Sequence, residues 1–316
     1  MPGNDGERPI DVTVGESDAG ERLDRFLARS IGISRQRAMA LIGAGKVRVG
    51  HRRAKKGEPL LAGATVRVEP LEPAGPAPEA LLPLVVLHED PFLVALDKPA
   101  GMNMHPLAPG ERGTLANAVL ARFPDVAGAS PEERCPGLVH RLDRETSGVV
   151  LWARTPSAFE ALRAQFADKT VVKRYWALVE GFVEGAGELD LKLAHDPKNA
   201  ARMVATPYPR EAIAQKARPA VTRYRTLANG ERATLLEVEI PTGVMHQIRA
   251  HFSFVGHPVV GDALYGAAAG EGVARHLLHA WSIEFAHPDG SGRRTIASPL
   301  PDDFRRSLVR MGIAPP

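Results

Sequence analysis

Residues 136–150, PGLVHRLDRETSGVV, place a dense group of charged side chains between two apolar stretches. A carboxylate, Asp143, stands between Arg141 and Arg144, shortly before the apolar run VVLWA. Such a carboxyl group can attack carbon as a nucleophile or accept a proton as a general base, and nearby guanidinium groups favour its ionised form. An aspartate between arginines also orders loops through ion pairs, and on residue types alone this structural interpretation is favoured.

The sequence contains no other recognisable catalytic or metal motif. His246 and His251 stand five residues apart in HQIRAH, which is not the HExxH spacing of a zinc site. His276 and His279 have no acidic third ligand nearby in sequence, so we expect them to be structural. Cys135 has no recognisable histidine partner, and the patterns GxxxxGK(S/T), GxGxxG and GxSxG are absent. We therefore expect no metal and no cofactor.

A single cysteine among 316 residues rules out internal disulfide bonds and a cysteine-based zinc cluster, which fits a reducing compartment. The hydrophobic fraction is 44% and the charged fraction 24%, as in ordinary globular proteins with a sizeable core. The first residues, MPGNDGERPIDV, are polar, and no apolar run approaches the length of a membrane span. These observations predict a cytoplasmic protein without a membrane partner, and no feature demands an oligomer.

Positive charge is concentrated in residues 22–56. This segment holds eleven Arg or Lys residues and one acid, Asp24, a net charge of +10. Because the whole chain carries +3, the remainder carries −7. A basic segment of this kind is typical of a binding site for a polyanion, although a solvated charged face would have the same composition.

The same basic segment has the periodicity of a folded module. Leu23, Phe26 and Leu27 follow the i, i+3, i+4 spacing of one helix face, and Ser34 is placed to cap a second helix over RQRAMALIGA. Glycines end that helix. The stretches KVRV and ATVRVEP then alternate like short strands on either side of the basic loop HRRAKKGEPL. We expect two short helices followed by a small hairpin.

This order of elements resembles the RNA-binding module of the ribosomal protein S-four type. The matching stretches are ERLDRFLARS, SRQRAMALIGAGKVRV and ATVRV, within residues 20–69. The family usually follows the first strand with Asn-Gly, whereas this chain has Gly50 and His51. The resemblance implies phosphate contacts that position the protein on RNA without reading its sequence. The candidate contacts are Arg35, Arg37, Lys46, Arg48, Arg52 and Arg53.

A proline-rich stretch separates this module from the rest of the chain. Residues 69–83, EPLEPAGPAPEALLP, contain five prolines and little periodicity, which predicts a semi-rigid linker. We therefore divide the chain into an N-terminal tail at 1–19, the module at 20–69, the linker at 70–83 and a second domain at 84–316.

The second domain mixes strands and helices without strict alternation. Apolar or alternating runs predict strands, and amphipathic runs predict helices, one of them capped by Thr114. Asn229-Gly230 between two alternating runs predicts a hairpin over 220–240. The sequence favours an α+β domain with a mixed, mostly antiparallel sheet. Strands are expected in 84–90, 92–101, 149–154, 173–181 and, as strand or loop, 294–299, and helices in 114–123, 157–168 and 246–256.

The stretch GLVHRLDRETSGVVLWAR resembles the signature of RluA-type RNA pseudouridine synthases, in the RluD-like branch. Further blocks match this family in order over about 84–300: LDKPAGMNMHP, KRYWALVEG, RPAVTRYR, PTGVMHQIRAH, HPVVGDALYG and LLHAWSIEFAHP. One block departs from the family pattern. The family usually reads Thr-Gly-Arg-x-His-Gln, and Val244 replaces that arginine here.

The resemblance implies an enzyme that isomerises uridine to pseudouridine in structured RNA without a cofactor. Ribosomal RNA of the large subunit is the expected substrate, and transfer RNA is an alternative. Asp143 would be the essential carboxylate, either attacking the sugar carbon or removing a neighbouring proton to give a glycal. Arg249 would pair with Asp143, and Tyr175 would stack on the target base. Arg141, with His140 beside it, would contact the RNA and fill the gap left by the flipped base.

A second interpretation stays open at this point. The chain could be a non-catalytic RNA-binding or ribosome-assembly factor that retains the same fold. A carboxylate-based glycoside hydrolase is a third class, but no second paired acid stands in a recognisable motif.

Overall fold

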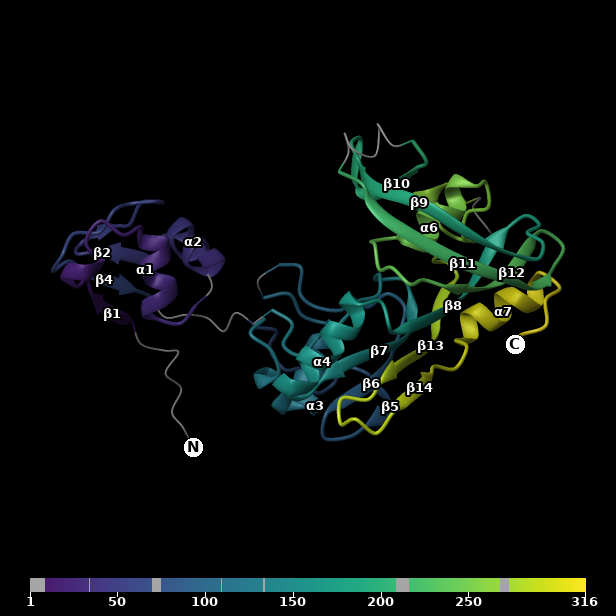
Figure 1. The fold of residues 1–316 in the computed structure, drawn as a ribbon, viewed down its shortest axis with the longest axis horizontal. Helices are drawn as coiled ribbons and strands as arrows, with labels where there is room; N and C mark the ends of the chain where they lie inside the picture. The colour runs from purple at the N-terminus through teal and green to yellow at the C-terminus, as the bar shows by residue number, and fades with distance from the viewer. Residues whose placement is uncertain are drawn as a thin grey trace. The chain divides into compact units, whose positions relative to one another are not determined.

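The computed structural model describes residues 9–33, 35–69, 75–108, 110–132, 134–208, 216–267 and 273–316. It divides into two compact units, residues 1–74 and 75–316, which are described separately (Figure 1). Among the described residues, the buried apolar cluster of the smaller unit runs from Val14 to Val68, with Ile10 and Val12 packed against it. The core clusters of the larger unit draw on residues from Leu84 onward.

The smaller unit consists of two helices and a four-stranded antiparallel sheet in the order β1-β4-β2-β3. Leu23, Phe26 and Leu27 are buried on one face of α1, which confirms the predicted helix and its inner face. Ser34, the predicted cap of the second helix, lies outside the described residues. The elements are β1 (Ile10–Thr13), η2 (Glu16–Asp18), α1 (Leu23–Ser30), α2 (Arg35–Ala44), β2 (Val47–Val49), β3 (Arg52–Arg53) and β4 (Thr65–Val68).

This unit begins earlier than the sequence predicts. Residues 10–13, assigned to an N-terminal tail, form β1, which pairs with β4 so that Ile10 lies opposite Val68. Four alternating residues are too few to distinguish a strand from a polar tail by pattern alone, because a period of two repeats only twice in them.

The larger unit also begins earlier than the predicted domain boundary. The Glu79 amide donates to the Asn117 carbonyl oxygen at 2.9 Å, and the Asn117 side chain donates to the Ala77 carbonyl oxygen at 2.6 Å. Residues 75–83, expected to be linker, are therefore bound to α3 of the larger unit. The first part of the predicted linker, residues 70–74, lies outside the described residues.

One mixed sheet forms the centre of the larger unit. In the described residues it has ten strands in the order β10-β9-β11-β12-β8-β13-β7-β6-β5, with β14 paired to β13. Every pair is antiparallel except β7 with β13, as predicted for a mostly antiparallel α+β domain. The strands are β5 (Val85–Glu89), β6 (Leu93–Lys98), β7 (Ser147–Ala153), β8 (Val172–Glu180), β9 (Ala186–Asp196), β10 (Asn199–Thr206), β11 (Arg218–Asn229), β12 (Ala233–Glu239), β13 (Leu278–Ala286) and β14 (Arg293–Ala297).

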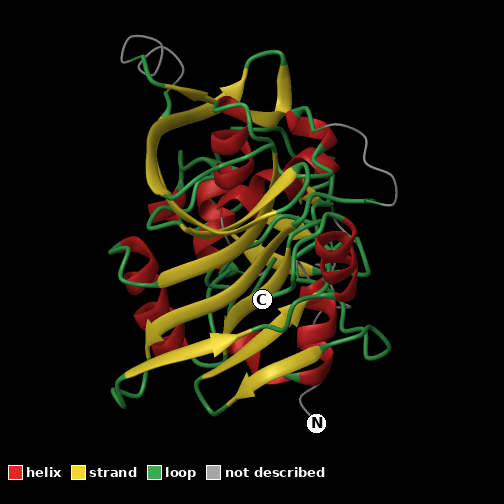
Figure 2. Cartoon of the chain, turned by 90° about the vertical axis from the view of Figure 1, so that its right-hand side faces the viewer, coloured by secondary structure: helices red, strands yellow, loops and turns green. Residues whose placement is uncertain are grey.

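Helices cover both faces of this sheet (Figure 2). Side chains alternate along a strand, so Val94 and Leu96 of β6 pack in the cluster with α3 and α6, whereas Leu93 and Ala95 pack with α4. The last helix, α7, packs against β8 and β12 and was not predicted. The helical elements are α3 (Leu115–Arg122), η3 (Pro124–Gly128), α4 (Pro156–Ala167), α6 (Gln247–Phe254), η4 (Ala263–Tyr265) and α7 (Asp302–Arg310).

The predicted elements of this unit are confirmed to within a few residues. Thr114 caps α3, accepting a hydrogen bond from the Asn117 amide in a capping box. Stretch 294–299, expected as strand or loop, contains β14. The sequence patterns predicted no element for β9, β10 or β13.

Candidate active site

A cavity of about 720 Å³ lies in the larger unit where several segments meet. Its walls come from the loop before β7, the first half of β8, the end of α4, and the turn and helix at 240–249. These segments are distant in the sequence, and the sheet order brings them together because β8, β13 and β7 are neighbours.

Asp143 lies on the loop before β7 and its carboxylate meets Arg249 of α6. Its Oδ2 accepts a hydrogen bond from Arg249 Nη1 at 3.1 Å. The same guanidinium donates from Nε and Nη2 to the two oxygens of Asp262, at 2.6 and 2.9 Å. This bidentate pair fixes the plane of the guanidinium, so the remaining donor approaches Asp143 from a fixed direction.

Burial differs sharply across these three side chains. Asp262 is 1% exposed and Arg249 7%, whereas Asp143 keeps 22% of its side chain exposed and lines the cavity. Burial opposes the charge of Arg249, but the hydrogen bonds and charges of Asp262 and Asp143 outweigh it and raise the pKa of the guanidinium. The cation therefore stays charged. Asp143 and Arg249 both line the cavity, and Asp143 is the only one of the two carboxylates that does.

His246 and Tyr265 complete the surroundings of this carboxylate. His246 precedes α6 with φ 54°, and its Nε2 lies 3.7 Å from Asp143 Oδ2. Its Nδ1 shares a 3.1 Å hydrogen bond with the Tyr265 hydroxyl, and the Arg249 guanidinium lies 5.0 Å from the Tyr265 ring centroid. Burial lowers the pKa of His246, although the Asp143 charge opposes this. A neutral imidazole beside Asp143 leaves Arg249 as the permanent cation there.

Tyr175 projects from β8 into the cavity. Its residue is 7% exposed, and it pairs in register with Val238 of β12. Burial, and then the negative charge of Asp143, raise the pKa of its phenol above the ordinary value. The hydroxyl is therefore protonated at physiological pH, which suits an apolar ring that positions a base better than a group that removes a proton.

A buried lysine holds the Asp143 loop to the sheet. Lys98, at the end of β6, is fully buried, and its Nζ donates to the carbonyl oxygens of Pro99, Met102 and Arg144 at 2.8–2.9 Å. Burial lowers the pKa of this ammonium to about 7. At the other end of the loop, Thr146 shares a 2.8 Å hydrogen bond with His276.

The two arginines beside Asp143 do not hold its carboxylate, contrary to the sequence-based expectation. Arg144 Nε donates to the Gly101 carbonyl oxygen at 2.9 Å and the guanidinium pairs with Glu145 at 3.6 Å. Arg141 is exposed, lines the cavity and makes no hydrogen bond or ion pair with another residue that the structure describes. The loop turns Asp143 toward α6 and its neighbours toward solvent, so the paired cation comes from Arg249.

His140 lines the cavity but is bound within the protein. Its Nε2 accepts a hydrogen bond from the Leu151 amide at 2.9 Å, and its ring stacks on Phe166 at 4.8 Å between centroids. Burial lowers the pKa of this imidazole to about 3. The geometry suits a residue that fixes the loop to β7 and α4.

Four further basic side chains line the cavity: Arg163, Lys169, Lys173 and Arg218. Lys173 Nζ donates to the Thr242 carbonyl oxygen at 3.0 Å, and burial lowers its pKa to about 8. This ammonium therefore lies at the turn where Val244 replaces the arginine of the family pattern.

Val244 itself faces an apolar cluster. It is 8% exposed and packs in the cluster that contains Met203, Ala220 and Tyr265. The valine side chain offers no hydrogen bond to a ligand, whereas the Lys173 ammonium is bonded to Thr242 and would lie 3.6 Å from a Cβ on Gly243.

The candidate RNA contacts of the smaller unit differ in how they are held. Arg35 Nε donates to Asp24 at 2.6 Å, Arg52 pairs with Glu58, and Arg53 donates to the Gly43 carbonyl oxygen at 3.0 Å. Hydrogen bonds and the charges of Arg35 and Arg22 outweigh burial and lower the pKa of Asp24 to about 2. The remaining candidates are Lys46 and Arg48, exposed on either side of the start of β2, and Arg37, half-buried in α2.

The other residues considered from the sequence are occupied elsewhere. Burial raises the pKa of the Cys135 thiol to about 11, the opposite of what a nucleophilic cysteine needs. His276 bonds Thr146, and His279 Nδ1 shares a 3.0 Å hydrogen bond with Ser147. Their interpretation as structural histidines is consistent with these partners.

Sequence reasoning missed several residues of the site, namely Lys98, Lys173, Asp262 and Tyr265. Each of them stands inside a sequence block that matches the family pattern, and membership in such a block is the sequence feature that could have indicated them. Burial and pairing were not readable from them, because Asp262 lies 13 residues and Asp143 106 residues from the arginine that they share.

The larger unit thus holds a cavity with one carboxylate among basic side chains, and the smaller unit contains a strongly basic segment, as expected for an enzyme that acts on a polyanion. The structure is similar to Human RNA Pseudouridylate Synthase Domain Containing 4, with a TM-score of 0.57 and 25% identity, covering 73% of this chain and 94% of that one. Residues 92–254 match the family model "RNA pseudouridylate synthase", and residues 21–66 match "S4 domain".

The chain belongs to the RNA pseudouridylate synthase family and is an isomerase that acts on RNA. It is 36% identical over 312 residues to ribosomal large subunit pseudouridine synthase D of Xanthomonas campestris, covering 94% of this chain and 91% of the relative. It is 34% identical over 320 residues to ribosomal large subunit pseudouridine synthase C of Vibrio cholerae, covering 95% and 96%. None of the described helices is long and apolar enough to cross a membrane.

Proposed function

We propose that this protein converts uridines of large-subunit ribosomal RNA to pseudouridine, with Asp143 as the catalytic carboxylate and without a cofactor. One observation carries the proposal: Asp143 is the only acidic side chain among the described residues that line the cavity. It is partly exposed to that cavity and hydrogen-bonded to Arg249, while basic side chains occupy much of the surrounding wall.

The reaction is an isomerisation, so nothing besides protons is exchanged with solvent. The bond between the sugar C1′ and the base N1 breaks, the base turns, and a new bond joins C1′ to C5. The hydrogen on C5 leaves as a proton, and N1 gains one. Asp143 can act by forming an ester at C1′ or by removing the proton on C2′ to give a glycal, and both routes use the ionised carboxylate that Arg249 favours.

The cavity also supports the choice of isomerisation over hydrolysis. A hydrolase needs a second carboxyl group to activate water or protonate the leaving group. Among the described lining residues no second acid is present, because Asp262 is buried behind Arg249. An enzyme that must return the same base to the same sugar gains from such a site, since water that captured C1′ would release the base.

Tyr175 and Arg141 have separate roles in this proposal. Tyr175 presents an aromatic ring, with its hydroxyl protonated, on which the uracil stacks, so that its function is to position the base. Arg141 is exposed at the cavity and fills the space that the extruded uridine leaves in the RNA, where a planar cation can stack and donate hydrogen bonds. His140 supports the loop that carries Arg141.

The choice of substrate rests on the relatives. Two that match over more than nine-tenths of this chain are named for the large ribosomal subunit. The basic smaller unit, whose S4 match covers residues 21–66, supplies the phosphate contacts that hold structured RNA. Transfer RNA is the alternative substrate, and a direct assay on both RNA classes distinguishes them.

The decisive experiment is release of tritium from RNA labelled at uridine C5, measured for wild-type protein and for Asp143→Asn. Release by wild type and none by the variant, with RNA affinity retained, is the expected result. Asp190→Asn, which changes an exposed aspartate of β9 outside the cavity, is the matched control and keeps full activity. Activity that survives in Asp143→Asn would overturn the assignment, and no release by wild type would leave a non-catalytic RNA-binding factor as the better interpretation.

A further inference from the structure

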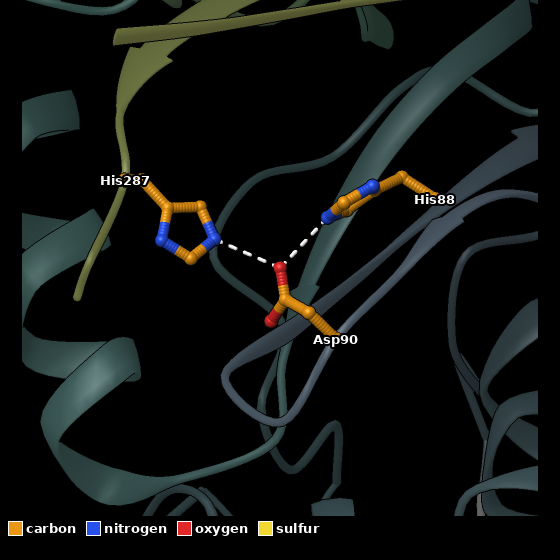
Figure 3. Close-up of side chains that lie close together, drawn as sticks. All are labelled: His88, Asp90 and His287. Atoms are coloured by element: carbon orange, nitrogen blue, oxygen red, sulfur yellow. Dashed lines mark hydrogen bonds and ion pairs between the residues drawn. The ribbon is translucent and has the colours of Figure 1, made fainter. Parts of the chain in front are cut away.

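A second cluster of ionisable side chains lies far from Asp143. Figure 3 shows His88, Asp90 and His287 pointing toward one another, with one carboxylate oxygen between two imidazole rings. Asp90 Oδ2 lies 2.7 Å from His88 Nε2 and 2.8 Å from His287 Nε2. One ligand atom from each residue lies within 4.8 Å of the others, so the three donors could bind a single ion.

The cluster is at the opposite end of β7 from the catalytic loop. Ser147 begins β7 beside the Asp143 loop, and Arg154, just after β7, donates to the Asp90 carbonyl oxygen at 2.9 Å. A strand of seven residues is about 23 Å long. An ion held by His88, Asp90 and His287 would therefore be too distant to take part in the chemistry at Asp143.

Asp90 is held in the orientation of a ligand. Its Oδ1 accepts hydrogen bonds from the backbone amides of Phe92 and Leu93, at 2.7 and 3.0 Å, which leaves Oδ2 directed at the two histidines. Burial opposes its charge, but hydrogen bonds from His88, from these amides and from His287 outweigh it and lower the pKa of Asp90 to about 2. The carboxylate is thus ionised and fixed without any rearrangement.

His287 has the outer partner that metal-binding histidines usually have. Its Nδ1 lies 2.6 Å from Asp289 Oδ1, so Nε2 is the nitrogen that faces the cluster. Histidine ligands commonly donate their other N–H to a carboxylate, which fixes the ring and makes it a better donor. The His287 ring is 4% exposed and has Phe92 edge-on at 5.9 Å, so it is packed in place.

We propose that His88 Nε2, Asp90 Oδ2 and His287 Nε2 form a binding site for a divalent transition-metal ion, with water completing its coordination. Two imidazoles and one carboxylate suit Zn²⁺, which binds such ligands tetrahedrally at about 2.0–2.2 Å. Hard cations such as Mg²⁺ prefer all-oxygen sets and are not expected to bind.

The geometry requires one adjustment. Four-coordinate bonds of this length separate ligand atoms by about 3.4 Å, whereas the two nitrogen–oxygen distances here are 2.7 and 2.8 Å. His88 can supply the movement, because its side chain is 37% exposed and it belongs to β5 at the edge of the sheet. On binding, the ion takes the place of the hydrogen bonds between Asp90 and the two imidazoles.

Such an ion would join three segments of the larger unit. His88 lies one residue before the end of β5, Asp90 begins the turn to β6, and His287 follows β13, 197 residues later than Asp90. Binding to the folded state alone stabilises it by mass action, so the ion would act as a clamp on this end of the sheet. This role is independent of the reaction proposed for Asp143.

The test uses the full-length, untagged chain, stripped of metal with a chelator and titrated with Co²⁺. One equivalent of Co²⁺ should give the intense visible absorption of a tetrahedral site, Zn²⁺ should displace it, and the melting temperature should rise with either ion. His88→Gln should weaken Co²⁺ binding by at least about tenfold, since one of three ligands is removed, and Asp289→Asn by about tenfold through its outer hydrogen bond. His195→Gln, an exposed histidine outside the cluster, should bind like wild type.

Two results would overturn the proposal. One is the absence of a stoichiometric tetrahedral Co²⁺ spectrum in the wild-type chain. The other is unchanged affinity in His88→Gln, which would place any bound metal elsewhere. His88→Gln keeps a side-chain donor for Asp90, and its melting temperature without metal shows whether the variant is still folded when the spectrum is absent.

Discussion

Arg249 is shared between a buried carboxylate, Asp262, and a partly exposed one, Asp143, and this sharing affects the charge in the cavity. Asp262 takes two of its donors and is almost fully buried, while Asp143 takes one. Two carboxylates around one guanidinium leave a net negative charge, and the exposed Asp143 carries it into the cavity. A simple pair of Asp143 with Arg249 would instead neutralise the carboxylate that has to react.

The lowered pKa of Lys173 predicts how the affinity for RNA depends on pH. Its pKa is lowered by burial to about 8, so its ammonium is charged below that pH and loses its proton above it. If it contacts an RNA phosphate in place of the arginine missing at Val244, RNA affinity should fall as pH rises through about 8. Lys173→Gln should weaken RNA binding about tenfold at neutral pH, the value of one charged hydrogen bond, and should abolish this pH dependence. Dissociation constants measured between about pH 6.5 and about pH 9 test this.

The matched variant is Lys173→Arg, because a guanidinium keeps its charge over this range. It should bind RNA with an affinity near that of wild type at neutral pH and should not weaken above about pH 8. A Lys173→Gln variant with the same pH profile as wild type would assign the titration to another group.

Much of the proposed site could be predicted from the sequence, because its residues stand in blocks with a family pattern. Asp143, Tyr175 and Arg249 come from three such blocks, and the structure brings all three to one cavity. The pairing of Arg249 with Asp262 could not be predicted, since it depends on how α6 packs against the turn before η4. Likewise, no spacing rule relates His88 to a histidine 199 residues later.

At the scale of elements, the contact between β7 and β13 constrains one glycine severely. Gly148 has φ +120°, and a Cβ on it would lie 2.2 Å from the Ala280 carbonyl oxygen of β13. Gly148→Ala should therefore destabilise the protein by about 3 kcal/mol, from backbone strain together with overpacking. Activity should fall with it, because β7 directly follows the Asp143 loop. Urea unfolding gives the free energy, and tritium release gives the activity.

Gly185→Ala is the control for that variant. Gly185 also has a positive φ, +71°, but a Cβ there meets no atom within 4 Å. It should cost about 1 kcal/mol, from backbone strain alone. Equal losses of stability in the two variants would show that the contact with Ala280 relaxes freely and that β7 and β13 are not packed as tightly as described.

The hairpin of β11 and β12 was predicted correctly but for an incomplete reason. Asn229-Gly230 favours tight turns because glycine adopts positive φ, yet Gly230 is not among the glycines with positive φ here. A Cβ on Gly230 would instead lie 2.1 Å from the Met311 carbonyl oxygen, after α7. The glycine is needed for close packing with the C-terminal segment, which local sequence cannot reveal. The parallel pairing of β7 with β13 escaped prediction for the same reason, since its partners are 132 residues apart.

At the scale of the molecule, the two units differ in charge and have separate apolar cores. The smaller unit contains the segment with a net charge of +10, and all the described residues of its core belong to that unit. The larger unit contains the cavity, Asp143 and all the residues that hold it. In the part of the chain that the structure describes, neither apolar core uses residues of the other unit, so each is expected to fold without its neighbour.

Removal of the smaller unit should separate RNA affinity from chemistry. A chain that begins at Gly75 should bind structured RNA more weakly, and its affinity should depend less steeply on salt concentration, because fewer counterions are released. The logarithmic slope should fall by about 0.7–0.9 for each phosphate that the protein no longer neutralises. Tritium release at saturating RNA should persist, since Asp143 and its partners remain. A salt slope equal to that of the full chain would mean that the basic segment is a solvated surface, and the larger unit would then account for RNA binding by itself.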